Sequence, residues 1–336
     1  MRRGAAWLAL ALVACGQEAP TATPPPPREV EDEPSEGHAA TEDPAPASLV
    51  RASGEVTVGG AEARVGADLA AEVPIEVPEG GQAVIQLRDG GRLELDGPAR
   101  AVLVEDSAAQ VMLLRGRLYA AQPPAGNAPR PPLRIAAPSS TVEIGHAGEV
   151  YVAVFDWGGS WVSVLQGGAA VSVGESDARQ RLRELDVVAG RAVAAPDRLA
   201  EPTEGPTRLA AAREAAAALA ALEAPAVEPA AERAALAQEA DRLDQALRSL
   251  ETETRRGRDL TSQHRDAVRQ GQTDEASRLQ RELVAHSQAL YRLRRLATAR
   301  WERVRAKHLR LDALGRAPSE DPVQARRDRV EGLLGR

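Results

Sequence analysis

The feature that most constrains the fold is a change in the spacing of apolar residues part-way along the chain. From about residue 51 to residue 195, short runs of Val, Leu and Ile alternate with polar residues and are separated by pairs of glycines. From Pro206 onward, apolar residues recur about every 3.6 positions, the period of a helix, whereas strict alternation is typical of half-buried strands. The sequence therefore predicts an all-β region followed by an α-helical region.

The strand pattern is clearest around the glycine pairs. In Arg92–Asp96 both leucines fall on one face, and the run Trp161–Val164 is followed by Ala169–Val173 across Gly167-Gly168. Strands with one solvent-exposed face are typical of antiparallel sheets. The segments between the strands are also too short for the crossover helices of a parallel sheet. We therefore predict a sandwich or a rolled β-solenoid over residues 50–196.

The helical region, residues 206–336, contains two long segments that are expected to form an antiparallel hairpin. Residues 229–270 and 274–314 each carry one apolar face, and the short turn between them requires the second helix to fold back on the first. Gly257 is the weak point, at which the first helix is expected to bend or loosen. Because an isolated hairpin leaves apolar surface exposed, a partner or an Ala-rich helix at about 207–223 should cover the rest. The residues at the 4-3-4-3 spacing of a coiled-coil seam are Leu236, Ala240, Leu243, Leu247 and Leu250.

The first residues have the order of a secretory signal. Arg2-Arg3 is followed by the apolar run Ala5–Ala14 and then by Cys15, the only cysteine of the chain. This run covers only about half of the roughly 20 residues that a membrane span needs. Leu12-Val13-Ala14-Cys15 resembles the bacterial lipobox, which implies that residues 1–14 are removed and that the sulfur of Cys15 carries diacylglycerol. We therefore expect a lipid-anchored protein and no disulfide.

The segment after the anchor, residues 15–49, is predicted to be a disordered tether. It is rich in proline and carries eight acidic residues against Arg28 alone, a composition that cannot bury a core. Gly16 follows Cys15 in place of the aspartate that commonly retains such lipoproteins at the inner membrane. We therefore expect a chain that is anchored at the outer membrane and faces the periplasm.

A series of short motifs in residues 50–196 resembles the FecR domain of bacterial envelope proteins. Their order and spacing carry the resemblance, which implies the fold and the periplasmic setting of that family. One departure is Gly148-Glu149-Val150-Tyr151, where the family usually has Gly-Thr followed closely by Phe. Family members that regulate sigma factors have a membrane span before this domain, and the lipobox stands in its place here, so transmembrane signalling is not implied. The motifs are Gly54–Val56, Arg88–Leu93, Leu114–Leu118, Ala137–Val142, Val162–Val171 and Val187–Arg191.

The short motifs that carry a catalytic mechanism are missing from the sequence. It has no phosphate-binding loop that ends in Gly-Lys-Ser or Gly-Lys-Thr, no nucleophile elbow and no His-Glu-x-x-His. His286 and His308 are about six turns apart on one predicted helix, too far to share a metal. Aromatic residues make up 2% of the chain, which disfavours base stacking and thus nucleic-acid binding. We therefore expect that the protein is not an enzyme and that it has no catalytic residue, metal or cofactor.

Two sequence clusters are candidate binding sites. Tyr151, Phe155, Trp157 and Trp161 surround the Gly158-Gly159 turn, and they either pack within the sheet or form a ligand-binding patch.

The second cluster is a basic stretch. Arg278–Arg310 contains ten basic residues against two acidic ones. This is either a solvated helix face or a surface that binds anionic lipid, acidic cell-wall polymer or a negatively charged partner. The residues expected to contact such a surface are Arg292, Arg295, Arg303 and Lys307.

Together these features predict a non-catalytic binding or scaffold lipoprotein that acts in envelope assembly or surveillance. Its helices would bind an envelope protein or a second copy of the chain. The alternatives are a carbohydrate-active enzyme, which would need a paired acid and base in one groove, a cell-wall-binding protein, and a pure spacer.

Overall fold

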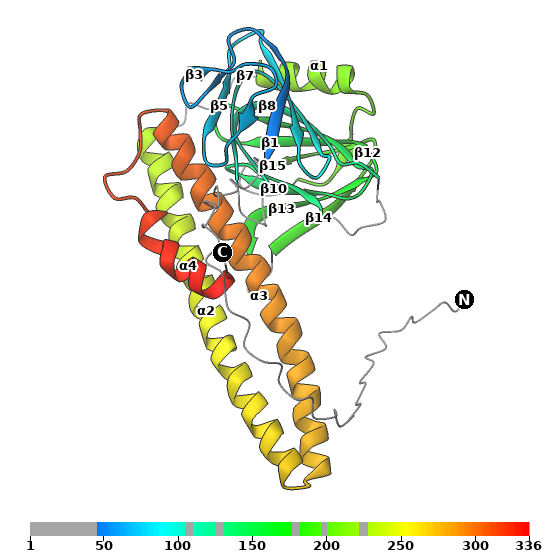
Figure 1. The fold of residues 1–336 in the computed structure, drawn as a ribbon, viewed down its shortest axis with the longest axis vertical. Helices are drawn as coiled ribbons and strands as arrows, with labels where there is room; N and C mark the ends of the chain where they lie inside the picture. The colour runs from blue at the N-terminus through cyan, green and yellow to red at the C-terminus, as the bar shows by residue number, and fades with distance from the viewer. Residues whose placement is uncertain are drawn as a thin grey trace, which may run out of the picture. The chain divides into compact units, whose positions relative to one another are not determined.

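The computed structural model describes residues 46–104, 110–124, 131–176, 182–195, 200–221 and 228–335. Over these ranges a strand-rich region is followed by long helices (Figure 1), so the predicted fold class is confirmed. The expected signal peptide, Cys15 and the tether up to residue 45 lie outside the described residues. Within the described ranges, no helix has both the length and the apolar character that crossing a membrane requires.

The strands of the described residues belong to one hydrogen-bonded sheet, in which every pairing is antiparallel except β8 with β9. The first eight are β1 (Ala47–Ser53), β2 (Thr57–Val58), β3 (Ala61–Glu62), β4 (Asp68–Leu69), β5 (Pro74–Val77), β6 (Gln82–Leu87), β7 (Arg92–Leu103) and β8 (Val111–Ala121). The others are β9 (Leu133–Ala136), β10 (Ser140–Ile144), β11 (Glu149–Val154), β12 (Ser160–Gln166), β13 (Gly168–Ser176), β14 (Leu182–Val188), β15 (Arg191–Ala195) and β16 (Thr203–Glu204).

The long hairpin of β7 and β8 is where the sheet branches. The first half of β7 pairs with β6 and its second half with β5, while β8 pairs with β9 at one end and with β11 at the other. The change of partner in β7 falls at the cis peptide bond Gly97-Pro98. A Cβ on Gly97 would lie 1.7 Å from the carbonyl oxygen of Pro78, so only glycine fits at this close approach. Apolar side chains from both branches, such as Ile85 and Val152, meet in one core.

The sheet begins before the expected boundary at residue 50 and continues past residue 196. Ala47 and Leu49 are buried and belong to β1, which pairs with β6. At the other end, β16 pairs with β15. The first residues of β1 were expected in the tether. Only Ala47 and Leu49 alternate with polar residues there, which is too short a pattern to distinguish a strand from a polar linker.

The helices are α1 (Leu209–Ala220), α2 (Pro229–Arg269), α3 (Thr273–Ala313) and α4 (Arg327–Leu334), with a 3₁₀ turn, η1 (Gln324–Arg326), before α4. α2 and α3 form the predicted hairpin, and the seam leucines of α2 are buried against α3. α2 continues through Gly257. A Cβ at that position would lie 2.2 Å from His286 Nε2. The glycine therefore makes room for the imidazole, whose Nδ1 is 2.8 Å from Glu253 Oε1.

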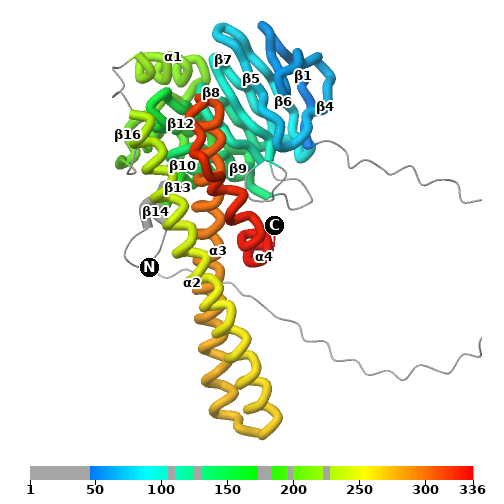
Figure 2. Tube along the Cα trace, turned by 90° about the vertical axis from the view of Figure 1, so that its left-hand side faces the viewer, coloured from blue at the N-terminus to red at the C-terminus, as the bar shows by residue number. Residues whose placement is uncertain are grey.

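One end of the hairpin packs on the sheet, and the end with the α2–α3 turn projects away from it (Figure 1 and Figure 2). α3 contacts β8, β9, β10 and β13, while α1 lies on β11 and β12. α4 packs on α2 and α3. The described sheet and helices thus belong to one compact unit, Pro44–Arg336.

Candidate functional site

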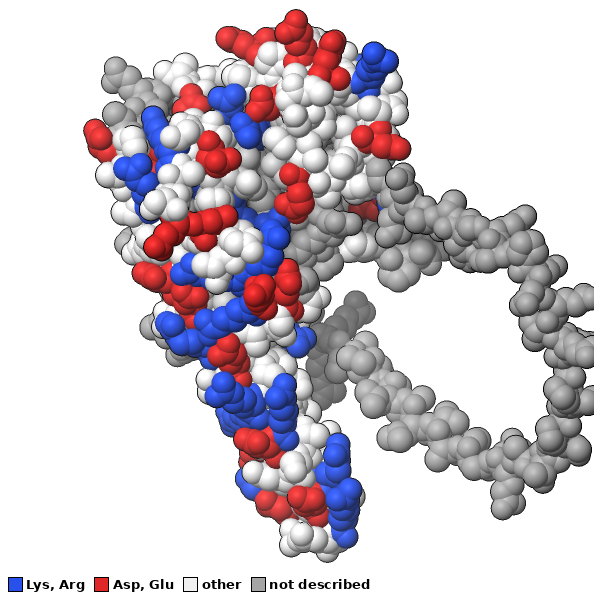
Figure 3. Space-filling model, turned by 60° about the vertical axis from the view of Figure 1, so that its left-hand side comes forward, with Lys and Arg blue, Asp and Glu red and all other residues white. Residues whose placement is uncertain are grey.

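Several basic residues of α3 have acidic partners on other elements. Arg305 Nη2 donates to both carboxylate oxygens of Glu72, at 2.7 Å each. Arg310 lies 3.6 Å from Glu232 of α2 and donates to the carbonyl oxygens of Leu114 and Asp156. On the face drawn in Figure 3, basic and acidic side chains alternate along the hairpin. Part of the excess of positive charge in the α3 sequence is thus compensated in the fold.

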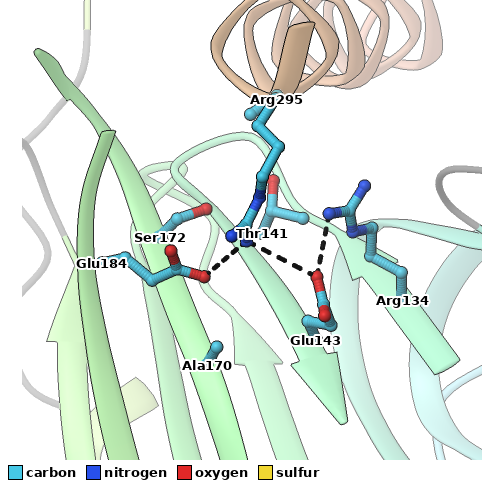
Figure 4. Close-up of a pocket in the computed structure, with 8 residues that line it drawn as sticks. Arg134, Thr141, Glu143, Ala170, Ser172, Glu184 and Arg295 are labelled. Carbon is cyan, nitrogen blue, oxygen red and sulfur yellow. Dashed lines mark hydrogen bonds and ion pairs between the residues drawn. The ribbon is translucent and has the colours of Figure 1, made fainter. Parts of the chain in front are cut away.

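A small hollow lies between α3 and the strands β10, β13 and β14 (Figure 4). Arg295 reaches from α3 into this space and donates to Glu184 of β14 at 2.8 Å, and it lies 3.8 Å from Glu143 of β10. Arg134 of β9 donates to Glu143 at 2.9 Å. Although burial lowers the pKa of Arg295, the carboxylates of Glu184 and Glu143 outweigh that effect and hold the pKa above its ordinary value.

The hollow suits a helix–sheet contact better than a substrate site. Its volume is about 10 Å³, which is about the space of one water molecule. Both of its carboxylates are held in ion pairs with arginine. Thr141 and Ser172 are the other polar residues that line it.

A second charged group is buried between α2 and α3. Arg300 Nη1 donates to Glu239 Oε1 at 2.7 Å, and Arg303 Nε lies 3.5 Å from the same oxygen. Burial raises the pKa of Glu239, but the two guanidinium groups outweigh it, so that the pKa lies below its ordinary value. Burial lowers the pKa of Arg303. These three side chains form a buried ionic cluster within the hairpin.

The structure does not bring the four representatives of the predicted basic surface onto one exposed face. Arg292 is exposed and Lys307 is half-buried. Arg295 is engaged with the sheet, and Arg303 is 2% exposed. Binding to an anionic surface therefore stays a prediction for the exposed arginines. One sequence signal could have indicated this burial, because Arg300 and Arg303 flank the apolar stripe of α3.

The four aromatic residues of the predicted patch fall into two pairs. Tyr151 and Trp161 are buried beneath α1. Phe155 and Trp157 are half-buried and stack on each other, with ring centroids 5.6 Å apart and planes 14° apart. The burial of Tyr151 and Trp161 is what packing against the sheet would produce. A ligand-binding role for the four residues stays a prediction.

An acidic pair that the sequence analysis missed lies next to these aromatic residues. Arg213 of α1 donates to Asp96 at 2.7 and 2.9 Å and to Glu94 at 3.1 Å. The Tyr151 hydroxyl also donates to Asp96, at 3.1 Å. Burial first, and then the charge of Asp96, raise the pKa of Tyr151. The alternation in β7 places Glu94 and Asp96 on the face opposite the leucines. That face was expected to be exposed to solvent, and the sequence did not indicate that α1 covers it.

Within the described residues, no group of three or more His, Cys, Asp or Glu side chains is arranged to hold a metal ion.

The chain is similar to known proteins over part of its length. No curated protein matches the chain. Two crystal structures of a "putative anti-sigma factor" from Parabacteroides distasonis, at 1.65 and 2.50 Å resolution, are similar at 14% identity and a TM-score of 0.33. Each match covers 40% of this chain and 60% of the other, so the chain spans less than two thirds of those structures. Residues 74–170 match the family described as FecR protein, and this part of the chain is therefore a FecR domain.

Proposed function

We propose that this chain is a lipid-anchored envelope protein whose FecR domain serves as a non-catalytic, protein-binding module in envelope signalling or surveillance. The FecR match supports a regulatory, envelope-associated role, and Cys15 after Leu12-Val13-Ala14 supports the lipid anchor. The anchor would face the periplasm, and an outer-membrane location follows from Gly16 after the cysteine.

One observation carries the binding role: the hairpin is fixed to the FecR domain at one end and projects from it at the other (Figure 1). Near the sheet, Ala306 packs with Met112 and Leu114 of β8, so this end is held by apolar contact as well as by ion pairs. A projecting coiled-coil hairpin offers a long surface at a defined position relative to the sheet. Such a surface is suited to a partner protein or to a second copy of the chain.

The hairpin also carries apolar side chains that a protein partner would cover. Val284 is 52% exposed and Tyr291 is 63% exposed. They are seven residues apart on α3, which places them on the same side of the helix. Arg292 and Arg294 lie beside Tyr291 and are exposed. Tyrosine and arginine are enriched at protein interfaces, so the expected partner has an apolar contact surface edged with acidic groups.

The chemistry of the helix–sheet hollow supports a non-catalytic role. A glycosidase needs two carboxyl groups on either side of a sugar, one of them protonated. Glu143 and Glu184 are instead each paired with an arginine, and the space of about 10 Å³ between them and α3 is too small for a sugar. The carbohydrate-active alternative therefore receives no support from this hollow.

The anchor and the binding role need separate experiments. Metabolic labelling with a palmitate analogue should mark the wild-type protein and leave Cys15→Ser unlabelled. Label retained by Cys15→Ser would contradict the anchor.

For binding, residues 16–336 can be immobilised and exposed to envelope extract, with Tyr291→Glu as the test variant. Gln280→Glu, at another exposed position of α3, adds the same charge away from Tyr291 and is the control. A protein captured by the wild type and by Gln280→Glu but lost with Tyr291→Glu supports the proposal. Equal capture by both variants contradicts it.

A further inference from the structure

The face of the sheet beneath α1 has the properties of a helix-binding groove. Its apolar floor is separate from the main core and is made by residues of four strands. Trp161 is 7% exposed and Tyr151 is fully buried, although both point away from that core and toward α1. The floor residues are Tyr119 of β8, Tyr151 and Ala153 of β11, Trp161 and Leu165 of β12, and Ala192 of β15.

α1 fills this groove with small side chains. Ala212 and Ala216 are its only buried residues, and Leu209 and Leu219 are partly buried at its two ends. A buried alanine contributes a single methyl group. The helix has 12 residues and no side-chain hydrogen bond at its N-cap, and isolated helices of this length are marginal in water. The helicity of α1 therefore depends on the groove, and α1 can be displaced by a better ligand.

The groove also specifies a charge on its occupant. Asp96 and Glu94 stand at its edge, and Glu94 is 7% exposed. Arg213 meets both carboxylates through the three hydrogen bonds given above, and its pKa is raised because Asp96 and Glu94 outweigh the effect of burial. Without Arg213, Asp96 would lose the two hydrogen bonds that it accepts from the guanidinium, which is costly, whereas Glu94 would keep its 2.6 Å ion pair with Arg92. Asp96 therefore favours an occupant that supplies a guanidinium group next to small apolar residues.

We propose that this groove is a recognition site for a helix of a partner protein, and that α1 is an internal ligand which occupies the site until the partner displaces it. The partner helix would carry leucine, alanine, arginine, alanine and leucine at the spacing of Leu209, Ala212, Arg213, Ala216 and Leu219. The proposal concerns a different surface from the projecting hairpin, and it does not depend on binding there.

The test uses the full chain and, as its probe, a fluorescent peptide with the sequence of residues 206–221. Ala216→Asp puts a carboxylate against the acidic groove and should expel α1, whereas Ala217→Asp makes the same change at an exposed position of the same helix. Fluorescence anisotropy should show that the peptide binds Ala216→Asp at least about tenfold more tightly than it binds the wild type or Ala217→Asp, a difference of about 1.4 kcal/mol. A peptide with glutamine in place of Arg213 should bind at least about tenfold more weakly.

A second variant covers the case in which Ala216→Asp does not fold. Arg213→Gln removes the guanidinium from the chain and leaves the floor of the groove unchanged, so the arginine-bearing peptide should bind it and quench or shift the fluorescence of Trp161. The proposal is overturned if either variant fails to bind the peptide although its circular dichroism spectrum shows an intact sheet. Equal binding of the arginine and glutamine peptides also overturns it.

Discussion

Arg300 and Glu239 form an ion pair at 2.7 Å in the seam of the helical hairpin, and both side chains are almost completely buried. Arg303 approaches the same carboxylate from the next turn of α3. Glu239 thus pairs directly with two buried guanidinium groups, and the charge of buried Glu302 also favours the charged form of Arg303. This arrangement makes the hairpin sensitive to the loss of one charge.

Glu239→Gln should destabilise the protein by about 3–5 kcal/mol, because it removes the carboxylate that pairs directly with the buried charges of Arg300 and Arg303. Urea denaturation followed by circular dichroism at 222 nm measures the change. Asp241→Asn, at an exposed position of α2, is the matched control and should change stability by less than about 0.5 kcal/mol. A Glu239→Gln variant as stable as the control would show that the cluster does not support the hairpin.

The same cluster predicts a loss of stability in acid. The folded-state pKa of Glu239 lies below its ordinary value, so its contribution is fully present above about pH 4.3, the ordinary glutamate value. It is lost as the pH falls through the lower folded-state pKa. The free energy of unfolding should therefore fall below about pH 4.3 more steeply in the wild type than in Glu239→Gln. Parallel curves for the two proteins would exclude this role.

The β region is expected to fold without the helices when its boundaries follow the sheet. Residues 46–205 contain the strands that enclose the main core, whereas a fragment of residues 50–196 lacks Ala47 and Leu49 of β1 and all of β16. The longer fragment should therefore melt cooperatively, at a higher temperature than the shorter one. A disordered circular dichroism spectrum for residues 46–205 would mean that α1 and α3 are needed to complete the fold.

Binding to an anionic surface is predicted to depend on the exposed arginines of α3. Changing Arg281, Arg292 and Arg294 to glutamine should reduce co-sedimentation of residues 16–336 with anionic vesicles or purified cell wall at low salt, because these side chains are exposed. The single change Arg292→Gln should already weaken binding, and its matched control, Arg305→Gln, removes the same charge at the sheet contact with Glu72 and should leave binding unchanged. Equal loss in both proteins would trace the effect to net charge alone.

The architecture could be predicted because it depends on local periodicity. The alternation of apolar and polar residues in Arg92–Asp96 indicates a strand, and the apolar spacing that begins at Leu236 indicates a helix. Each pattern can be recognised from a short stretch of neighbouring residues. The motifs of the FecR domain likewise follow the chain in order, and the family match at residues 74–170 confirms the resemblance over that range. The motifs Gly54–Val56 and Val187–Arg191 lie outside the matched residues.

The candidate sites could not be predicted in the same way, because their partners lie far apart in the sequence. Arg305 meets Glu72 and Arg213 meets Asp96 across more than a hundred residues. Counting charges along α3 suggested an uncompensated basic face, since the compensating acids come from β10, β14, α2 and the loop before β5. The aromatic residues near Gly158-Gly159 were found, yet the helix that covers two of them was not assigned to that face.

The most direct test of the binding role is photo-cross-linking in cells that carry the full-length, membrane-bound protein. A photoreactive residue at Tyr291 should form a discrete adduct with one protein partner or with a second copy of the chain, and the same residue at Gln280 should form little or none. Mass spectrometry then identifies the partner. No protein adduct at Tyr291, or the same diffuse pattern at both positions, would contradict the account of this chain as a protein-binding module.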